Sequence, residues 1–176
     1  PLRFGLVPEN EVAAVVDLPD ERVLRELAGV GQRRAGRVLA ADGAVVPEYK
    51  TLGSAGCDVC AHIENDLVIA AGKFAMIPTG LFFEIPESYE IQVRPRSGLA
   101  AKNGVTVLNT PGTIDSDYRG ELKIILINLG NEDFTVHNKD RIAQIIISPV
   151  TQAVFEATEK LSETERGNGG FGSTGV

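Results

Sequence analysis

Cysteine, long apolar runs and basic charge are all scarce in this sequence of 176 residues. Only Cys57 and Cys60 are present, so no disulfide framework holds the fold. No apolar run approaches the roughly 20 residues that a membrane-spanning helix needs, and the N-terminal residues lack a signal-peptide pattern. The formal net charge of −7 argues against a general surface for nucleic acid or anionic membranes, since those partners bind basic faces. We therefore expect a cytoplasmic protein with neither of these partners.

The two cysteines form a Cys-x-x-Cys pair with His62 close behind, which raises the possibility of a zinc site. A structural zinc ion normally needs four ligands, and the sequence contains no second pair. A redox pair is a further alternative, but residues three apart on a β-strand point to opposite faces. Buried free thiols are the favoured interpretation.

The first 36 residues differ from the rest of the chain. Asp17 resembles a helix N-cap with Pro19 in the first turn, and Gly29 resembles a C-cap. Between them apolar residues recur at helical spacing: Leu18, Val23, Leu24 and Leu27. We interpret residues 1–36 as a short, partly helical extension lying on the main domain, the alternative being a docking segment.

From residue 37 onward, short β-like runs alternate with turn residues. The candidate strands are residues 38–39, 57–61, 67–69, 74–77, 81–85, 89–93, 105–108, 122–128, 134–136, 142–150 and 154–156. Residues 78–80 (PTG) are one of the expected breaks, and residues 145–147 (III) are expected to be buried on both faces. Many short strands without interleaved helices predict an all-β sandwich or barrel over residues 37–164.

Two stretches carry candidate chemistry. Residues 109–120 (NTPGTIDSDYRG) combine turn residues, two carboxylates and a phenol between two apolar runs. Residues 165–176 form a Gly-rich tail that contains Arg166, Phe171 and a Ser-Thr pair. Glycine frees backbone N–H groups to surround phosphate, arginine adds charge, and a phenyl ring can cover a heterocycle. The alternative for the tail is a plain flexible linker.

Taken together, five short motifs resemble those of the trimeric dUTP pyrophosphatase (dUTPase) family. They are residues 54–59 (SAGCDV), 94–100 (RPRSGLA), 109–120, 140–144 (DRIAQ) and 166–175 (RGNGGFGSTG). Five motifs in one order form a specific signal, whereas one alone would be weak. Cys57-Asp58-Val59 stands where Leu-Asp-Leu is commoner, and the N-terminal segment is longer than usual.

The resemblance implies a jelly-roll-like β-barrel subunit and a homotrimer with active sites shared between chains. It also implies hydrolysis of dUTP to dUMP and pyrophosphate with Mg2+. This reaction keeps uracil out of DNA and supplies dUMP for thymidylate synthesis. The triphosphate and water would hold most of the Mg2+ coordination, with Asp58 acting through those waters or through a partner arginine rather than as a direct ligand.

Roles follow for the residues that match the motifs. Asp115 would orient the water that attacks the α-phosphorus, and Gln144 would contact that water or the α-phosphate. Tyr118 would exclude a 2′-hydroxyl, and the main chain of an expected hairpin between residues 109 and 123 would read uracil. The remaining substrate-binding residues are Arg96, Ser97 and Gly98 at the phosphates, Asn109, Gly112, Thr113, Ile114 and Lys123 at the nucleoside, and Arg166, Phe171, Gly172, Ser173 and Thr174 in the closing tail.

Two alternatives remain open at this point. A dCTP deaminase-like enzyme of the same fold would use a glutamate on the strand after the third-motif turn, but Glu121 follows Gly120 directly, closer than such an enzyme would place it. The tail would then have no evident role. A non-catalytic nucleotide-binding module is the second alternative, although Asp115, Gln144 and Arg166 are all intact.

Overall fold

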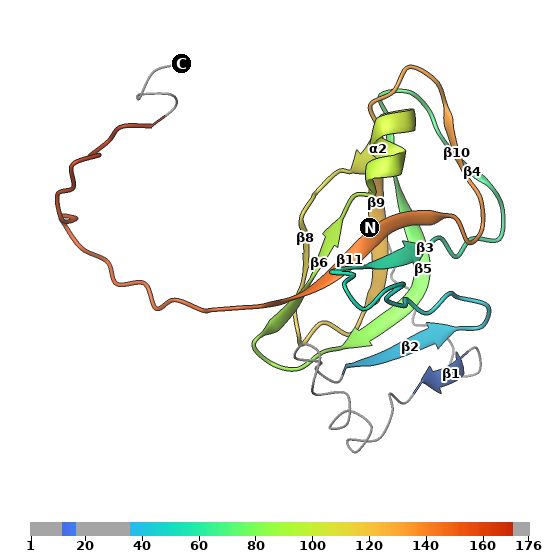
Figure 1. Ribbon diagram of the computed structural model, residues 1–176, viewed down its shortest axis with the longest axis horizontal. Helices are drawn as coiled ribbons and strands as arrows, with labels where there is room; N and C mark the ends of the chain where they lie inside the picture. The colour runs from blue at the N-terminus through green and yellow to red at the C-terminus, as the bar shows by residue number, and fades with distance from the viewer. Residues whose placement is uncertain (1–11, 17–35, 171–176) are drawn as a thin grey trace, which may run out of the picture.

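The chain folds mainly into β-strands, as its sequence predicts. The computed structural model describes the backbone of residues 12–16 and the whole of residues 36–170 (Figure 1). The helix predicted between residues 17 and 29 lies outside these ranges, as do four of the predicted tail residues: Phe171, Gly172, Ser173 and Thr174.

Eleven strands and one short helix are present in the described part of the chain. The helix is α2 (Ser97–Asn103), between β6 and β7. The strands are β1 (Val12–Val16), β2 (Arg37–Ala41), β3 (Cys57–Cys60), β4 (Leu67–Ile69), β5 (Phe74–Glu84), β6 (Tyr89–Arg94), β7 (Val105–Val107), β8 (Gly112–Ile114), β9 (Glu121–Asn128), β10 (Phe134–Val136) and β11 (Arg141–Pro149).

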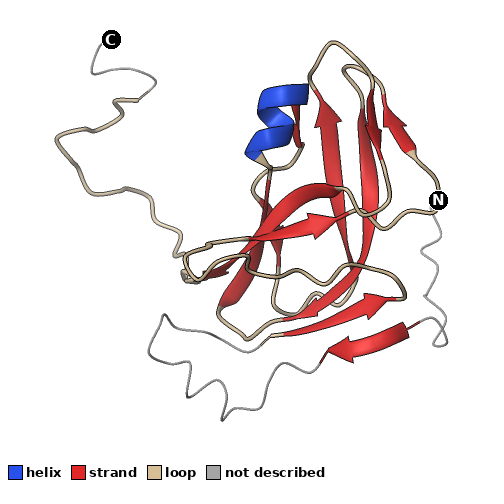
Figure 2. Cartoon of the chain, turned by 45° about the vertical axis from the view of Figure 1, so that its right-hand side comes forward, coloured by secondary structure: helices blue, strands red, loops and turns tan. Residues whose placement is uncertain are grey.

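Two larger sheets and one small sheet build the barrel. The first has five strands in the order β1-β2-β5-β9-β7, and the second has four in the order β3-β11-β6-β8. Strands β10 and β4 pair separately. Figure 2 shows the strands curving around one another, with the helix at one end of the barrel. Apart from β1 and β2, strands that pair in these sheets are not consecutive in the chain, which gives the jelly-roll-like all-β fold that the sequence predicts.

Alternating side chains from both sheets fill the barrel. On β9, Leu122, Ile124 and Leu126 are at most 1% exposed, while the residues between them face outward. β6 has the alternation expected from its sequence and buries Ile91 and Val93. Each such side chain contributes about 1.5–3 kcal/mol by leaving water, so the period-two pattern determines which face of each strand is inside.

The predicted break at residues 78–80 is wrong, because β5 continues through it as one strand. The register with β9 moves from Pro78↔Lys123 to Phe82↔Glu121, so three residues of β5 lie opposite Leu122 alone. The hydroxyl of Thr79 donates to the carbonyl of Leu122 over 2.6 Å. The turn residues therefore form a β-bulge inside the strand rather than an end to it.

Helix α2 and strands β1 and β8 were not predicted. The helix is one of seven residues with none buried, so it carries no apolar periodicity that sequence inspection could detect. It ends at Gly104, which has a φ of 67° and donates its N–H to Ala100. A Cβ at Gly104 would lie 2.8 Å from the backbone nitrogen of Gly130, so glycine is required there for two reasons.

The predicted strand at residues 154–156 is absent, and the segment has no strand partner in the described part of the chain. Val154 and Phe155 are each 93% exposed. Figure 1 shows this segment leaving the end of β11 and running away from the barrel. Within β11, Ile145 is buried while Ile146 and Ile147 are half-buried, so the expectation of burial on both faces is not met within one subunit.

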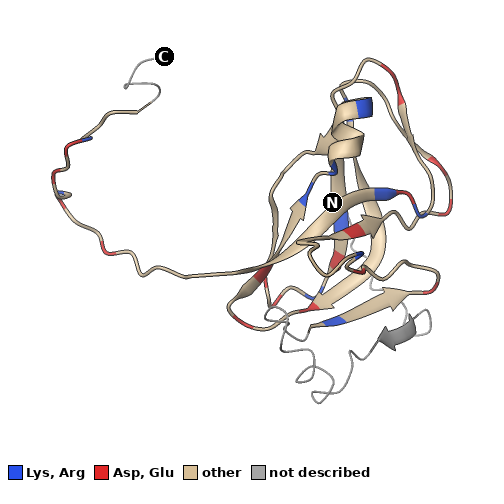
Figure 3. Cartoon of the chain, viewed as in Figure 1, with Lys and Arg blue, Asp and Glu red and all other residues tan. Residues whose placement is uncertain are grey.

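Charged residues of both signs are intermixed over the strands and loops (Figure 3). Within the described ranges, no helix combines the length and apolar character needed to cross a membrane.

Asn128 is a polar residue buried in the core. Its side-chain amide donates to the carbonyls of Ile69 (2.9 Å) and Glu132 (2.8 Å), and its side-chain oxygen accepts the N–H of Gly130 (2.9 Å). The residue is 0% exposed. It therefore ties the end of β9 to β4 and to the loop that leads into β10.

We expect Asn128→Ala to lower the free energy of unfolding by roughly 2–4 kcal/mol, since three backbone groups would lose a partner that water cannot easily replace. Urea unfolding followed by circular dichroism measures this. The control is Asn131→Ala, an exposed residue of the same loop, which should change stability by less than about 0.5 kcal/mol. Equal effects of the two substitutions would contradict the assigned role.

Candidate active site

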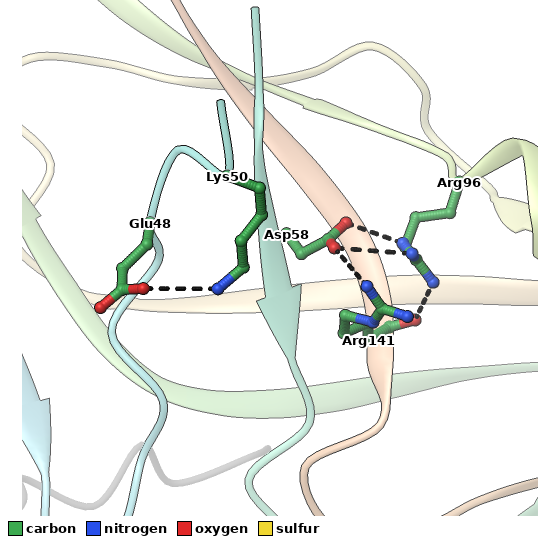
Figure 4. Close-up of polar contacts among 5 residues, drawn as sticks. All are labelled: Glu48, Lys50, Asp58, Arg96 and Arg141. Carbon is green, nitrogen blue, oxygen red and sulfur yellow. Dashed lines mark hydrogen bonds and ion pairs between the residues drawn. The ribbon is translucent and has the colours of Figure 1, made fainter. Parts of the chain in front are cut away.

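Asp58 lies between two arginines at the surface of the four-stranded sheet. Arg96 Nε donates to one carboxylate oxygen over 2.8 Å, and Arg141 Nη1 donates to the other over 3.1 Å (Figure 4). Arg96 also donates to the main-chain carbonyl of Arg141 over 3.2 Å. The Asp58 and Arg96 side chains are only 23% and 24% exposed, so these charge-assisted bonds are partly shielded from water. The sequence suggested that Asp58 contacts either the waters of Mg2+ or a partner arginine, and the contact with arginine is present.

The pairing of β11 with two neighbours brings three of the predicted motifs together. Gln144 lies opposite Asp58 of β3 and opposite Arg94 of β6. Its amide nitrogen donates to the carbonyl of Pro95 over 2.9 Å. A Cβ at Gly56 would lie 3.1 Å from the Gln144 side-chain oxygen, so the first motif passes closely over this residue. The contact with the Pro95 carbonyl was not predicted, because main-chain acceptors carry no residue-type signal.

The second motif turns from β6 into helix α2 at this point. Arg96 is the residue that precedes the helix, with extended backbone angles. Ser97 and Gly98 follow in the first turn and are exposed. Nothing lies within 4 Å of a Cβ built on Gly98, so the described chain leaves its backbone approachable from outside. An anion near Arg96 would meet a positive side chain, a hydroxyl and unobstructed N–H groups.

The expected hairpin from residue 109 to residue 123 is wrong in its pairing. β8 pairs with β6 of the four-stranded sheet, while β9 pairs with β5 and β7 of the other. Residues 115–120 therefore cross from one sheet to the other. The alternation of neighbouring runs does not reveal which strands become partners, so the local sequence could not distinguish a crossover from a hairpin.

Strand β8 places the start of this segment beside β6. Gly112 is buried, and a Cβ on it would lie 3.2 Å from the Asn109 side-chain nitrogen and 3.3 Å from Val93. Thr113 is exposed and Ile114 is half-buried. The close approach of Asn109 to Gly112 makes one compact surface from the turn and the strand, next to the strand that leads into the Arg96 turn.

Asp115 and Tyr118 occupy the crossover. The Asp115 carboxylate is exposed, with no hydrogen-bond partner among the described residues, and its carbonyl accepts the N–H of Tyr118 over 3.2 Å. Tyr118 is 45% exposed, and its ring folds back over Gly120, where a Cβ would collide with it. Its hydroxyl donates to the carbonyl of Glu121 over 3.1 Å. An exposed acid and a flat ring therefore lie on one short turn.

Lys123 follows on β9 with its amine 3.4 Å from the Glu121 carboxylate. The Glu121 side chain also accepts two N–H groups of β5, a contact that the sequence did not suggest. The carboxylate that the deaminase alternative would need is thus already engaged with the barrel.

The tail residue Arg166 does not reach this site in its own chain. Its Nε donates to the carbonyl of Gly169 over 2.7 Å, within a turn of the tail itself. Figure 1 shows that turn well separated from the barrel. The structure therefore brings the first, second and fourth motifs together and places the start of the third motif beside β6. The described part of the fifth motif lies apart.

Both cysteines are free and buried. Burial raises the pKa of each thiol above its usual range, because the thiolate would lose its hydration. A raised pKa means less thiolate at neutral pH, which disfavours reactivity and metal binding. Among the described residues, no group of three or more His, Cys, Asp and Glu side chains is placed to hold a metal ion. The preference for buried free thiols is confirmed.

Comparison with known proteins agrees with the geometry. The family model described as dUTPase matches residues 42–175. The chain is 62% identical over 130 residues to a deoxyuridine 5'-triphosphate nucleotidohydrolase of Bdellovibrio bacteriovorus, covering 74% of this chain and 87% of that one. It is 60% identical over 135 residues to the enzyme of the same name from Treponema denticola, covering 77% and 94%.

Solved structures show the same fold. A mutant of the Staphylococcus bacteriophage 80alpha dUTPase with dUpNHpp superimposes with a TM-score of 0.72 at 26% identity, covering 81% of this chain and 99% of that chain. A mutant dUTPase from phage phi11 of S. aureus, whose structure reveals coordination of a structural Mg(II) ion, gives a TM-score of 0.65 at 22% identity, covering 73% and 99%.

Removing the carboxylate between the two arginines should destabilise the fold. We expect Asp58→Ala to lower the free energy of unfolding by about 1–3 kcal/mol, because Arg96 and Arg141 would lose their shared partner and repel each other. Guanidinium chloride unfolding would mask an ionic effect, so urea is the denaturant to use. Asp117→Ala, in the exposed crossover, is the control and should be close to neutral. A neutral Asp58→Ala variant would mean that the ion pairs add nothing.

Proposed function

Because the chain belongs to the dUTPase family and is a dUTP diphosphatase, we propose that its hydrolysis of dUTP proceeds through a water molecule directed by Asp115. The water would attack the α-phosphorus, releasing pyrophosphate and leaving dUMP. The observation that carries this proposal is the Asp115 carboxylate, which is exposed on the crossover and has no hydrogen-bond partner among the described residues. The junction at Gln144, with the Asp58–Arg96–Arg141 cluster, supplies the phosphate-binding part of the site. In the cell the reaction would keep uracil out of DNA and supply dUMP for thymidylate synthesis.

The triphosphate would bind along the turn that begins helix α2. Arg96 supplies charge, Ser97 a hydroxyl and Gly98 an approachable N–H. Asp58 holds the Arg96 guanidinium over a contact of 2.8 Å, which restricts its rotamers before substrate arrives. Pre-ordering of this kind lowers the entropy lost on binding. Gln144 would present its remaining amide atoms to the α-phosphate or to the attacking water.

The nucleoside would lie against the β8 turn and the crossover. Asn109 and the main chain at Gly112, Thr113 and Ile114 would read uracil, and the exposed amine of Lys123 would contact the base or sugar. Tyr118 would lie under the deoxyribose, where its ring leaves no room for a 2′-hydroxyl. A hydroxyl pressed against that ring would lose its water partners without gaining others, and this would select against UTP.

Asp115 suits general-base chemistry because its carboxylate is exposed and uncommitted within the described chain. A carboxylate can accept a proton or a hydrogen bond from water without forming a covalent intermediate. Mg2+ would be held mainly by the substrate phosphates and water, where it would neutralise phosphate charge. Asp58 would act on the waters of that ion or through its arginines, since both of its oxygens accept N–H groups.

A homotrimer would complete the site. The tail leaves its own barrel, which supports closure over a pocket of another subunit by Arg166, Phe171, Gly172, Ser173 and Thr174. The outer face of the β5–β9 pair supports association as well. Phe74 and Met76 are 65% and 57% exposed, opposite Ile127 and Ile125. An apolar surface of this kind is typical of subunit interfaces.

We expect Asp115→Asn to reduce kcat for dUTP at least about 100-fold, because the amide cannot take the proton of the attacking water. KM should change little, since the side chain is nearly isosteric. Pyrophosphate release with Mg2+ is the assay, and Asp117→Asn, two residues along the same turn, is the control with nearly unchanged kcat. An unaltered kcat in Asp115→Asn would show that another group directs the water.

Deleting residues 166–176 should lower kcat strongly while leaving the thermal midpoint nearly unchanged, because the described part of the tail runs apart from its own barrel (Figure 1). Mixed trimers give the matched control. Truncated chains supply Asp115, Asp115→Asn chains supply tails, and reassembly of the two should restore activity that neither has alone. If reassembled mixtures stay inactive, each tail closes the site of its own chain.

A further inference from the structure

The β5 bulge leaves two backbone N–H groups without a ladder partner, and one side chain accepts both. Glu121 Oε1 receives the N–H of Thr79 over 3.2 Å and that of Gly80 over 3.0 Å. The Glu121 side chain is 20% exposed, so these bonds are partly shielded from water. Gly80 has a φ of 66°, and a Cβ there would lie 2.8 Å from the His62 ring, so the bulge has little freedom to rearrange.

The same glutamate contacts Tyr118 of the crossover and Lys123, two residues along β9. Its Oε2 lies 3.4 Å from the amine of Lys123, and its main-chain carbonyl accepts the Tyr118 hydroxyl over 3.1 Å. Glu121 thus makes polar contacts with the bulge, Tyr118 and Lys123. It therefore connects the rigid interior of the five-stranded sheet to two side chains at the nucleoside.

The Tyr118 ring depends on this anchor because it has few other constraints. It folds over Gly120, where a Cβ would lie 2.5 Å from the ring carbon that bears the hydroxyl. The residue is 45% exposed, and the carbonyl of Glu121 is the acceptor for its hydroxyl. The position of the ring thus follows the position of the first residue of β9, which is held on β5 by its pairing with Phe82 and by the Glu121 carboxylate.

We propose that Glu121 is a positioning residue for sugar recognition: its carboxylate fixes the first residues of β9 on the β5 bulge and so determines where the Tyr118 ring and the Lys123 amine lie. This inference rests on the proposed role of Tyr118 at the deoxyribose. Glu121 does not act on the substrate itself, because both carboxylate oxygens are engaged with protein groups. Selectivity for dUTP over UTP should depend on it.

The test compares four variants with the parent protein. Glu121→Ala removes the acceptor, and Glu121→Met keeps the side-chain length without an acceptor, in case the alanine variant does not fold. Glu121→Gln keeps an oxygen for the two N–H groups but loses the charge that faces Lys123. Glu87→Ala, at an exposed glutamate in the turn between β5 and β6, is the matched control. The readout is the ratio of kcat/KM for dUTP to that for UTP, with urea unfolding measured in parallel.

We expect Glu121→Ala and Glu121→Met to lower the dUTP:UTP ratio about tenfold, since a small displacement of a recognition group is costly. Glu121→Gln should keep the ratio within about threefold of the parent, and Glu87→Ala should leave it unchanged. A uniform loss of stability would not by itself alter a ratio between two substrates. If Glu121→Met and Glu121→Ala keep the parental ratio, the inference is wrong, whatever their stability.

A second arm separates this inference from the proposed role of Tyr118. Tyr118→Ala should lower the dUTP:UTP ratio, and adding Glu121→Ala to it should lower the ratio no further, because both act through one ring. Additive losses would overturn the coupling while leaving the role of Tyr118 intact. If Tyr118→Ala alone leaves the ratio unchanged, the sugar-reading assignment fails and the inference fails with it.

Discussion

The pairing of β11 with β3 on one side and β6 on the other is the constraint on which the site depends. Gln144 stands at the junction, opposite Asp58 and Arg94. A slip of one residue would turn Ile145 out of the core and Gln144 into it. Core packing therefore fixes the strand register that brings Asp58, Arg96 and Arg141 within hydrogen-bonding distance. The geometry of the polar cluster thus depends on the buried apolar side chains of β11.

Much of this organisation was predictable from local sequence. The alternation in β6 and the apolar runs of β9 and β11 give strands because a half-buried strand repeats every two residues. The choice of which strands pair with each other was harder to predict from the sequence. Nothing near Gly112 shows that β8 joins β6 rather than β9, and the Pro-Thr-Gly stretch favours a turn although Glu121, some 40 residues away, completes a bulge there. Such contacts depend on distant residues, which local patterns do not contain.

The candidate site likewise contains residues that the sequence identified and contacts that it did not. Motif resemblance identified Asp58, Asp115 and Gln144, and the structure gives each a defined place. The resemblance could not identify Pro95, which contributes a main-chain carbonyl to Gln144, or the contacts of Glu121 with the β5 bulge and Tyr118. Glutamate is chemically capable of acid–base work, so its residue type suggested catalysis. Its contacts indicate a positioning role instead. Only its neighbours in three dimensions distinguish a positioning role from a catalytic one.

Strand β1 has a consequence for the edge of the five-stranded sheet. It pairs with β2 from Val12↔Ala41 to Val16↔Val38, and both strands lie outside the residues that match the family model. Without it, β2 would present a row of unpaired N–H and C=O groups to other protein molecules. Strand β1 thus covers the edge of the sheet. Removing it should make the protein more prone to aggregate during expression or storage.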